Sequence, residues 1–193
     1  YTQVFENNMD VKGEPKIEPY KDKPYTKITF TPDYQRFNCE ELSDDLCALV
    51  KKRTYDMVAC SSGKIKVSYN GNPSIINDFN DYISLYIGSD TPRICQTIND
   101  RWSIAACLST LNDGGFQQVS FVNGINTNKG GKHVEYITKQ IIVNMVKYIE
   151  KKKKIKVKEN TIKENLMIFV NSVIVNPSFD SRTKETLTTN KSK

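Results

Sequence analysis

The run LMIFVNSVIV, residues 166–175, constrains the fold more than any other stretch of the chain. Apolar residues stand at both odd and even positions of this run, so a strand formed here needs cover on both of its faces. A strand of this kind belongs in the interior of a sheet, with other layers packed above and below it. We therefore expect residues 166–175 to form a central strand.

A long amphipathic helix is predicted just before this strand, in HVEYITKQIIVNMVKYIEKKKK, residues 133–154. The preceding segment, FQQVSFVNGI, has the composition of a strand. Strand, helix and strand in this order, with a crossover long enough for a helix, predict a βαβ unit with parallel strands. The apolar residues that recur at helical spacing are Val134, Ile137, Ile141, Ile142, Met145, Val146 and Ile149.

The first half of the chain mixes both kinds of element. We expect a strand in YTKITFT (25–31), a helix that begins at an Asn38 cap and runs to about residue 59, and a short helix over 79–86. Asn70-Gly71 predicts a hairpin, because this dipeptide tolerates the two positive φ angles of a tight turn. The fold class is therefore α+β.

Turn signals divide the second half. GSDTPR (88–93) is a plausible boundary, and the turn NDGG separates the strand RWSIAACLS (101–109) from FQQVSFVNGI. Asn123-Gly124 predicts either a second hairpin or a simple end to the strand. We favour the end of the strand, because the residues after it are polar.

Charge is concentrated in one place. The net charge is +6, and six lysines fall within KKKKIKVK, residues 151–158. A run of this density is either a solvated helix end or an electrostatic footprint for phosphates, and charge alone favours neither.

Other residue types exclude several function classes. The five cysteines form no CxxC pair and no zinc-like grouping with His133, which is typical of reduced thiols in an intracellular protein. His133 has no Ser or Cys arrangement around it that supports nucleophilic catalysis, so we expect it to be structural. The chain has no apolar run of the ~20 residues needed to cross a bilayer, so we expect no membrane association.

Three strings carry a resemblance that covers essentially the whole chain: QVFENNM with YTKITFTPDYQRF, FVNGINTNKGGKHVEYITKQI, and FVNSVIVNPSFDSRTKETL. In this order they closely resemble eukaryotic-type (type IIA) DNA topoisomerase II, either cellular or from a large DNA virus. The resemblance implies that residues 1–87 are the C-terminal part of a GHKL ATPase domain, an α/β sandwich. It implies that residues 88–193 are a transducer domain with a βαβ crossover and a ribosomal-protein-like fold.

The resemblance also implies that several catalytic groups of the full-length enzyme lie outside this fragment. In this family the catalytic glutamate, the magnesium-binding asparagine and the glycine-rich lid lie upstream of the position matched by Tyr1. The full-length protein is therefore expected to use ATP and Mg²⁺, while this fragment alone is expected to be inactive and to bind no cofactor.

One candidate site comes from the last string. The family has a Gln-Thr-Lys loop whose lysine contacts the γ-phosphate of ATP, and Arg182-Thr183-Lys184 stands at that place. The resemblance thus implies that all three residues bind ATP and that Lys184 is catalytic. Arg182 departs from the usual Gln, and it either donates to phosphate oxygens or pairs with Asp180 or Glu185.

A second candidate site is the lysine run. Lys151, Lys152 and Lys153 align with a basic loop that faces DNA in this family, with Lys154 and Lys156 as neighbours. The implied partners are double-stranded DNA and a second copy of the full-length enzyme, in the nucleus or a viral replication compartment. The competing hypotheses are a related GHKL ATPase of the gyrase B or mismatch-repair type, and a non-enzymatic nucleic-acid-binding module.

Overall fold

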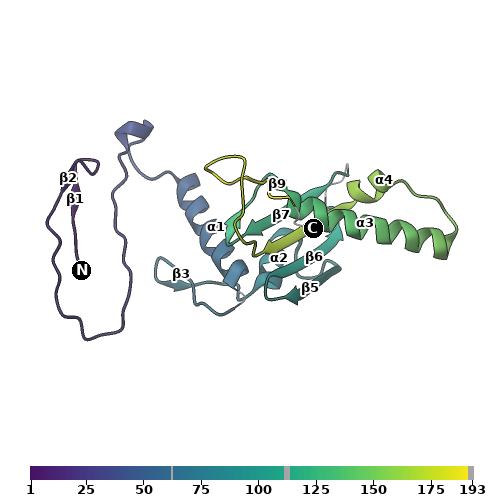
Figure 1. The fold of residues 1–193 in the computed structure, drawn as a ribbon, viewed down its shortest axis with the longest axis horizontal. Helices are drawn as coiled ribbons and strands as arrows, with labels where there is room; N and C mark the ends of the chain where they lie inside the picture. Colours follow the sequence, from purple (N-terminus) through teal and green to yellow (C-terminus); the bar gives the residue numbers. More distant parts are fainter. Residues whose placement is uncertain (62, 111–113, 191–193) are drawn as a thin grey trace. The chain divides into compact units, whose positions relative to one another are not determined.

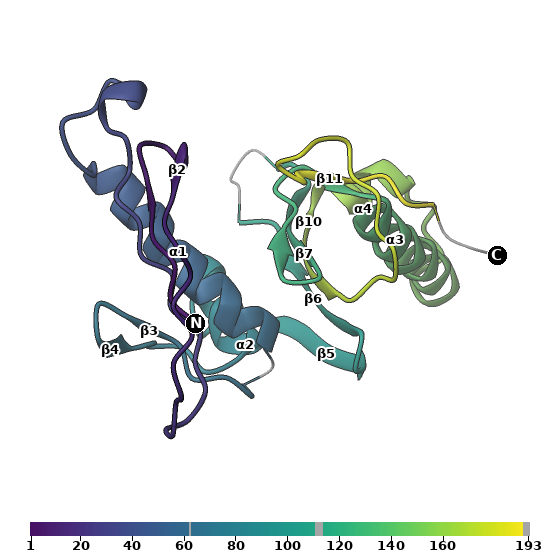
Figure 2. The same cartoon turned by 60° about the vertical axis from the view of Figure 1, so that its left-hand side comes forward.

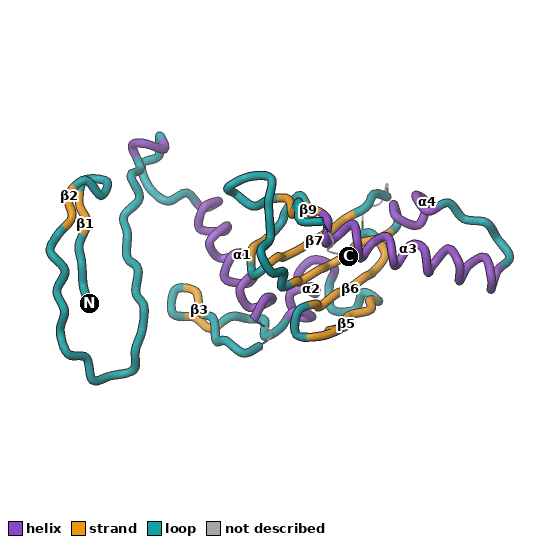
Figure 3. The backbone as a smooth tube through the Cα atoms, in the orientation of Figure 1, coloured by secondary structure: helices purple, strands orange, loops and turns teal. Residues whose placement is uncertain are grey.

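The structure, a computed structural model, describes residues 1–61, 63–110 and 114–190. The chain divides into two compact units, Tyr1–Leu42 and Ser43–Lys193. The first unit is mostly loop, as Figure 3 shows. It contains the two-stranded antiparallel pair β1 (Phe5–Glu6) and β2 (Val11–Lys12), and a short 3-10 helix at Gln35–Phe37.

Two expectations for this region are wrong. Residues 25–31 form no strand, although their side chains alternate, because a strand needs a partner and no described residue pairs with them. Asn38 does not begin a helix; it follows the 3-10 helix in the left-handed region, with φ 52°. The first long helix, α1 (Asp44–Ser61), is instead preceded by Ser43, whose hydroxyl accepts from the backbone N–H of Leu46 at 3.2 Å.

A five-stranded sheet forms the centre of the second unit, in the order β5-β6-β10-β7-β8. Its strand β10 pairs antiparallel with β6 and parallel with β7. The expected central strand is therefore confirmed, although it ends at Ser172 instead of residue 175. The strands are β5 (Arg93–Asn99), β6 (Trp102–Leu108), β7 (Gln117–Val122), β8 (Ile125–Asn126) and β10 (Leu166–Ser172).

The βαβ unit is also confirmed. The parallel strands β7 and β10 are joined through the long helix α3 (Lys132–Lys153) and the short helix α4 (Glu159–Glu164), as Figure 1 shows. Helix α4 was not expected, because its six polar-rich residues carry no clear period.

One strand of the sheet was not expected from the sequence, and one hairpin was the alternative that we did not favour. Strand β5 pairs antiparallel with β6 at the sheet edge. At Asn123-Gly124, with φ values of 51° and 79°, the chain makes a hairpin between β7 and β8. Our preference for a simple strand end was therefore wrong, because the backbone geometry of the dipeptide outweighs the polarity of residues 125–128.

Helices cover both faces of this sheet. Figure 2 shows α1 and α2 (Phe79–Ile87) on one side and α3 and α4 on the other. On the first face, Tyr82 and Ile83 of α2 pack with Phe121 and Phe169 of the sheet. On the second face, the apolar side of α3 packs against alternate residues of β10, such as Ile168 and Val170. The expected apolar face of the long helix is thus confirmed.

The remaining expectations concern a hairpin, a turn, the cysteines and a possible membrane span. The hairpin at Asn70-Gly71 is present, as β3 (Ser68–Tyr69) and β4 (Asn72–Pro73). Asn112 and Asp113 of the expected NDGG turn lie outside the described residues. All five cysteines are free thiols. None of the helices in the described ranges is both long and apolar enough to cross a membrane.

Candidate functional site

The loop that carries Arg182, Thr183 and Lys184 leaves the end of β10 and folds back on itself. The backbone N–H of Thr188 donates to the carbonyl of Ser178 at 2.9 Å, and that of Asp180 donates to the carbonyl of Thr186 at 3.2 Å. These two bonds close the base of the loop, so its tip projects from a backbone scaffold. We call residues 178–188 the phosphate loop, after the role that the family resemblance predicts for them.

The tip of the phosphate loop is a turn. The backbone N–H of Lys184 donates to the carbonyl of Ser181 at 3.1 Å, which places Arg182 and Thr183 at its corner. The carboxylate of Asp180 accepts from the backbone N–H of Thr186 at 3.1 Å. The pKa of Asp180 is lowered, first by a side-chain hydrogen bond from Thr186 and further by this backbone bond. The turn therefore presents three exposed side chains, those of Arg182, Thr183 and Lys184.

Lys184 is held in an unusual backbone conformation, with φ 58°. Its ammonium lies 5.7 Å from the centroid of the Phe179 ring, within the range of a cation–π contact. Such a contact at an exposed position is weak, so it orients the ammonium and leaves it available to an anion.

Arg182 takes neither of the two internal partners considered from the sequence. The Asp180 carboxylate bonds to Thr186 and Ser181, and the Glu185 carboxylate pairs with Lys129. Within the described ranges, Arg182 has no ion pair, so its guanidinium is also accessible to an external anion.

The base of the phosphate loop is attached to the start of α3. Strand β11 (Thr186–Leu187) runs parallel to β9 (Gly130–Gly131), the two residues directly before the helix. A Cβ on Gly131 would overlap the backbone nitrogen and carbonyl oxygen of Leu187 and lie 2.9 Å from its Cα, and Gly131 has φ 131°. Only glycine fits this position, because both the close approach and the backbone conformation exclude a side chain.

His133 is buried behind this contact, at 2% exposure. Its Nε2 lies 3.2 Å from the hydroxyl of Thr127, and burial lowers the pKa of His133 to about 4. The imidazole is therefore neutral at physiological pH and contributes to packing, in agreement with the structural role expected for it.

The lysine run lies at the opposite end of α3. Lys151, Lys152 and Lys153 form the last turn of the helix, and Lys154 ends it in the left-handed conformation. All of these side chains are exposed, as is Lys156 in the segment that leads to α4. Lys151–Lys153 are thus helical residues, in agreement with the helix expected over residues 133–154, and their charges also complement the helix dipole.

Helix α3 links the two candidate sites. It has 22 residues, a length of about 33 Å at 1.5 Å per residue. The phosphate loop attaches at its first turn through β9 and β11, and the lysines occupy its last turn. The structure does not bring the two sets together; it places them at the two ends of one packed helix.

Comparisons with known proteins agree on one family. A model described as "DNA gyrase B" matches residues 74–193. The chain is 48% identical to a protein named DNA topoisomerase 2 from Pisum sativum, over 98% of this chain, and 46% identical to DNA topoisomerase 2 from Arabidopsis thaliana, over 97%. It spans 13% of the length of each of these relatives.

A solved structure gives the same result for the fold. The chain matches the crystal structure of the ATPase region of Saccharomyces cerevisiae topoisomerase II with a TM-score of 0.85 and 43% identity. The match covers 97% of this chain and 48% of that one.

Proposed function

This chain belongs to the DNA gyrase B family and is similar along its length to eukaryotic topoisomerase II, and on that premise we propose that it is part of an ATP-dependent type II DNA topoisomerase. We assign residues 1–87 to the end of a GHKL ATPase domain and residues 88–193 to a transducer domain. The observation that carries the proposal is the identity of 46–48% over 97–98% of the chain to proteins named DNA topoisomerase 2.

In this proposal Lys184 contacts the γ-phosphate of ATP. The ammonium is a compact charge on a flexible stem, and the turn at Ser181–Lys184 holds it at an exposed tip. A charge placed there stabilises the negative charge that develops during phosphoryl transfer, without any proton transfer. The contact exists while the γ-phosphate is attached and disappears when phosphate leaves.

Arg182 and Thr183 complete the phosphate contact in this proposal. Arg182 can donate two parallel N–H bonds to phosphate oxygens, a geometry that the usual Gln of the family does not offer. The Thr183 hydroxyl lies 2.9 Å from that of Ser181, which orients it at the corner of the turn.

Lys151, Lys152 and Lys153 contact the DNA backbone in this proposal. Three exposed charges on one helical turn suit phosphates, and such contacts carry no sequence information. Strand passage requires a surface of this kind, because the enzyme acts on any duplex that reaches it.

Helix α3 then couples the two events. A displacement of the phosphate loop after hydrolysis is passed to Gly130 and Gly131 through β11, and from there along α3 to its lysines. A helix whose apolar face is packed on the sheet moves as a unit, so a shift at one end reaches the other.

The proposed partners of the full-length protein are double-stranded DNA, ATP with Mg²⁺ and a second copy of itself, in the nucleus. In the described ranges no three His, Cys, Asp or Glu side chains gather as a metal site. A bacterial gyrase B subunit, a mismatch-repair ATPase and a non-enzymatic DNA-binding module are all less favoured than a eukaryotic-type topoisomerase II by the identities above.

Relaxation of supercoiled plasmid by the full-length protein tests the proposal. We expect relaxation that requires ATP and that changes the linking number in steps of two, the mark of duplex passage. Relaxation in steps of one, or DNA binding without any change of topology, contradicts it.

A further inference from the structure

The phosphate loop is attached to a turn just before β9 and α3, residues 127–130, which we call the entry turn. The backbone N–H of Gly130 donates to the carbonyl of Thr127 at 2.8 Å and closes this turn. Its exposed corner residue Lys129 contacts Glu185 of the phosphate loop through both its backbone and its side chain. The position of the entry turn therefore determines where this part of the phosphate loop lies.

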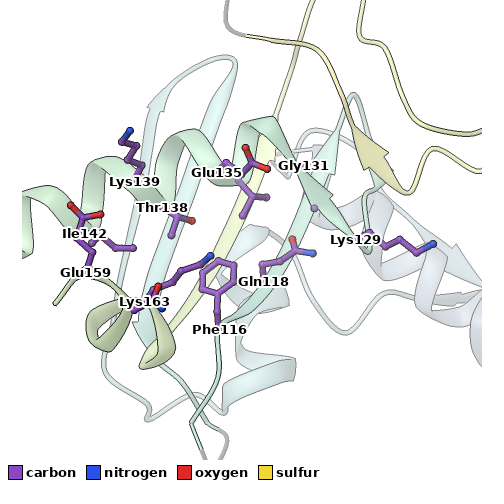
Figure 4. Close-up of a pocket in the computed structure, with 13 residues that line it drawn as sticks. Phe116, Gln118, Lys129, Gly131, Glu135, Thr138, Lys139, Ile142, Glu159 and Lys163 are labelled. Carbon is purple, nitrogen blue, oxygen red and sulfur yellow. The ribbon is translucent and has the colours of Figure 1, made fainter.

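The base of the entry turn is buried and is hydrogen-bonded to side chains of β7. Thr127 and Ser120 are both fully buried. The Ser120 hydroxyl donates to the carbonyl of Thr127 at 3.0 Å and lies 2.6 Å from its hydroxyl. The side-chain nitrogen of Gln118 donates to the carbonyl of Asn128 at 2.9 Å. Figure 4 shows that the Lys129 side chain extends away from that of Gln118, so β7 holds the turn on one side and Lys129 leaves it on another.

The polar character of this contact has a physical consequence. The Thr127 hydroxyl also lies 3.2 Å from Nε2 of His133 in the first turn of α3, so Ser120, Thr127 and His133 form one polar cluster inside the core. Apolar packing has no preferred direction, whereas hydrogen bonds inside a core are directional and costly to break. The cluster thus fixes the entry turn against both β7 and α3 more exactly than apolar residues of the same size.

We propose that Ser120 and Gln118 are positioning residues for ATP hydrolysis, which place Lys184 at the γ-phosphate by holding the entry turn. They hold the base of the turn, and Lys129 at its corner holds Glu185, the residue directly after Lys184. Both act through Lys184 and do not contact the nucleotide. This inference rests on the function proposed above, because it requires the contact of Lys184 with ATP.

Ser120→Ala in the full-length protein is the first variant, followed by steady-state ATPase measurements. We expect kcat to fall about fivefold, the equivalent of one lost hydrogen bond, because Lys184 is then less well placed at the reacting phosphate. We expect KM to change much less than kcat, since the lost contact acts mainly in the transition state.

Ser172→Ala is the matched control. Ser172 is also fully buried, lies on the neighbouring strand β10, and donates to the carbonyl of Phe121 at 2.9 Å. Its replacement removes one buried hydroxyl bond from the same sheet, but not a bond to the entry turn. We expect the two alanine variants to have similar thermal midpoints, with kcat of Ser172→Ala near that of wild type.

Combination with Lys184→Ala separates positioning from a general loss of packing. A residue that acts only through Lys184 has nothing left to position once the ammonium is removed, so the double variant should have the kcat of Lys184→Ala. A further drop of about fivefold in the double variant means that the two effects are independent, and it overturns this inference alone. An unimpaired Lys184→Ala enzyme overturns the proposed phosphate contact together with this inference.

Two other results also overturn it: kcat of Ser120→Ala equal to wild type, and equal losses of kcat in Ser120→Ala and Ser172→Ala. If Ser120→Ala fails to fold, Gln118→Met takes its place in the same cycle with Lys184→Ala. It removes the N–H donor to Asn128 from a half-buried residue and keeps the length of the side chain. Additive effects of Gln118→Met and Lys184→Ala then overturn the inference, and a double variant equal to Lys184→Ala supports it.

Discussion

The ammonium of Lys129 lies 2.5 Å from the carboxylate of Glu185, and the backbone N–H of Lys129 donates to the carbonyl of Glu185 at 3.1 Å. Lys129 directly precedes β9, and Glu185 directly precedes β11 in the phosphate loop. The shared hydrogen bond raises the pKa of Lys129 and lowers the pKa of Glu185. Two contacts from one residue to another thus attach the loop to the start of α3.

Exchanging these two charges tests the attachment. Glu185→Gln in the full-length protein should lower the ATPase rate, by less than loss of Lys184, because the loop then lacks one of its two anchors. The double variant Lys129→Glu with Glu185→Lys should recover most of the rate. A double variant no better than Glu185→Gln contradicts the pairing.

The same pair makes stability depend on pH. Since the pKa of Glu185 is lowered on folding, the pair's contribution to the free energy of unfolding is present above the pKa of the unfolded carboxyl group. This contribution is lost as the pH falls through the pKa of the folded state.

Lys184→Ala should slow ATP hydrolysis by the full-length protein. Loss of one charge contact to the reacting phosphate costs on the order of 2–4 kcal/mol of transition-state stabilisation, about 30- to 1000-fold in rate. Arg182→Gln, which introduces the usual family residue, is the matched control and should have a far smaller effect. Steady-state ATPase and supercoil relaxation measure both. An unimpaired Lys184→Ala enzyme shows that Lys184 does not sense the γ-phosphate, and Arg182 is then the next residue to test.

Replacing Lys151, Lys152 and Lys153 together with alanine should weaken binding to duplex DNA of any sequence. Three lost phosphate contacts lower the slope of log K against log salt by about 2.7, at roughly 0.9 per contact. The control is the triple alanine variant of the exposed residues Lys21, Lys23 and Lys27 in the first unit. Equal slopes for the two triple variants identify the last turn of α3 as a solvated helix end only.

Gly131→Ala should destabilise the protein and detach the phosphate loop. The new Cβ meets backbone atoms of Leu187 at 2.9 Å or less, in a conformation that alanine rarely adopts. We expect a loss of more than about 2 kcal/mol in the free energy of unfolding. Gly124→Ala is the control: Gly124 has φ 79° but nothing within 4 Å, so the cost is the conformational strain alone, about 1 kcal/mol. Urea unfolding compares them, and equal losses contradict the predicted clash.

Stability should fall as the pH drops from about 6.5 to about 4, because of His133. Its pKa is about 4 when buried, against an ordinary value of 6.5, so the unfolded chain binds the extra proton across this window. The free energy of unfolding therefore decreases with decreasing pH, by on the order of 3 kcal/mol in total. His133→Gln should flatten this part of the profile in urea unfolding measured at several pH values. An unchanged profile shows that other groups cause the dependence.

Local and repeated signals were enough to predict part of this fold from the amino-acid sequence. Seven apolar residues recur at helical spacing along α3, and β10 is apolar on both faces. Both patterns therefore show from the sequence alone which side chains must be buried. The hairpin at Asn70-Gly71 could be predicted from the backbone freedom of two adjacent residues. The candidate residues in the phosphate loop and the lysine run came from the family resemblance, because no period or spacing identifies them.

Features that depend on a distant partner became visible only in three dimensions. Residues 25–31 alternate like a strand and form none, while β9 and β11 are two residues each and pair although α3, α4 and β10 lie between them in the sequence. A strand is stable only when it pairs with another strand, and the sequence of one chain does not show which segments will pair. The contacts of Lys129 with Glu185 and of Gly131 with Leu187 arise from that pairing.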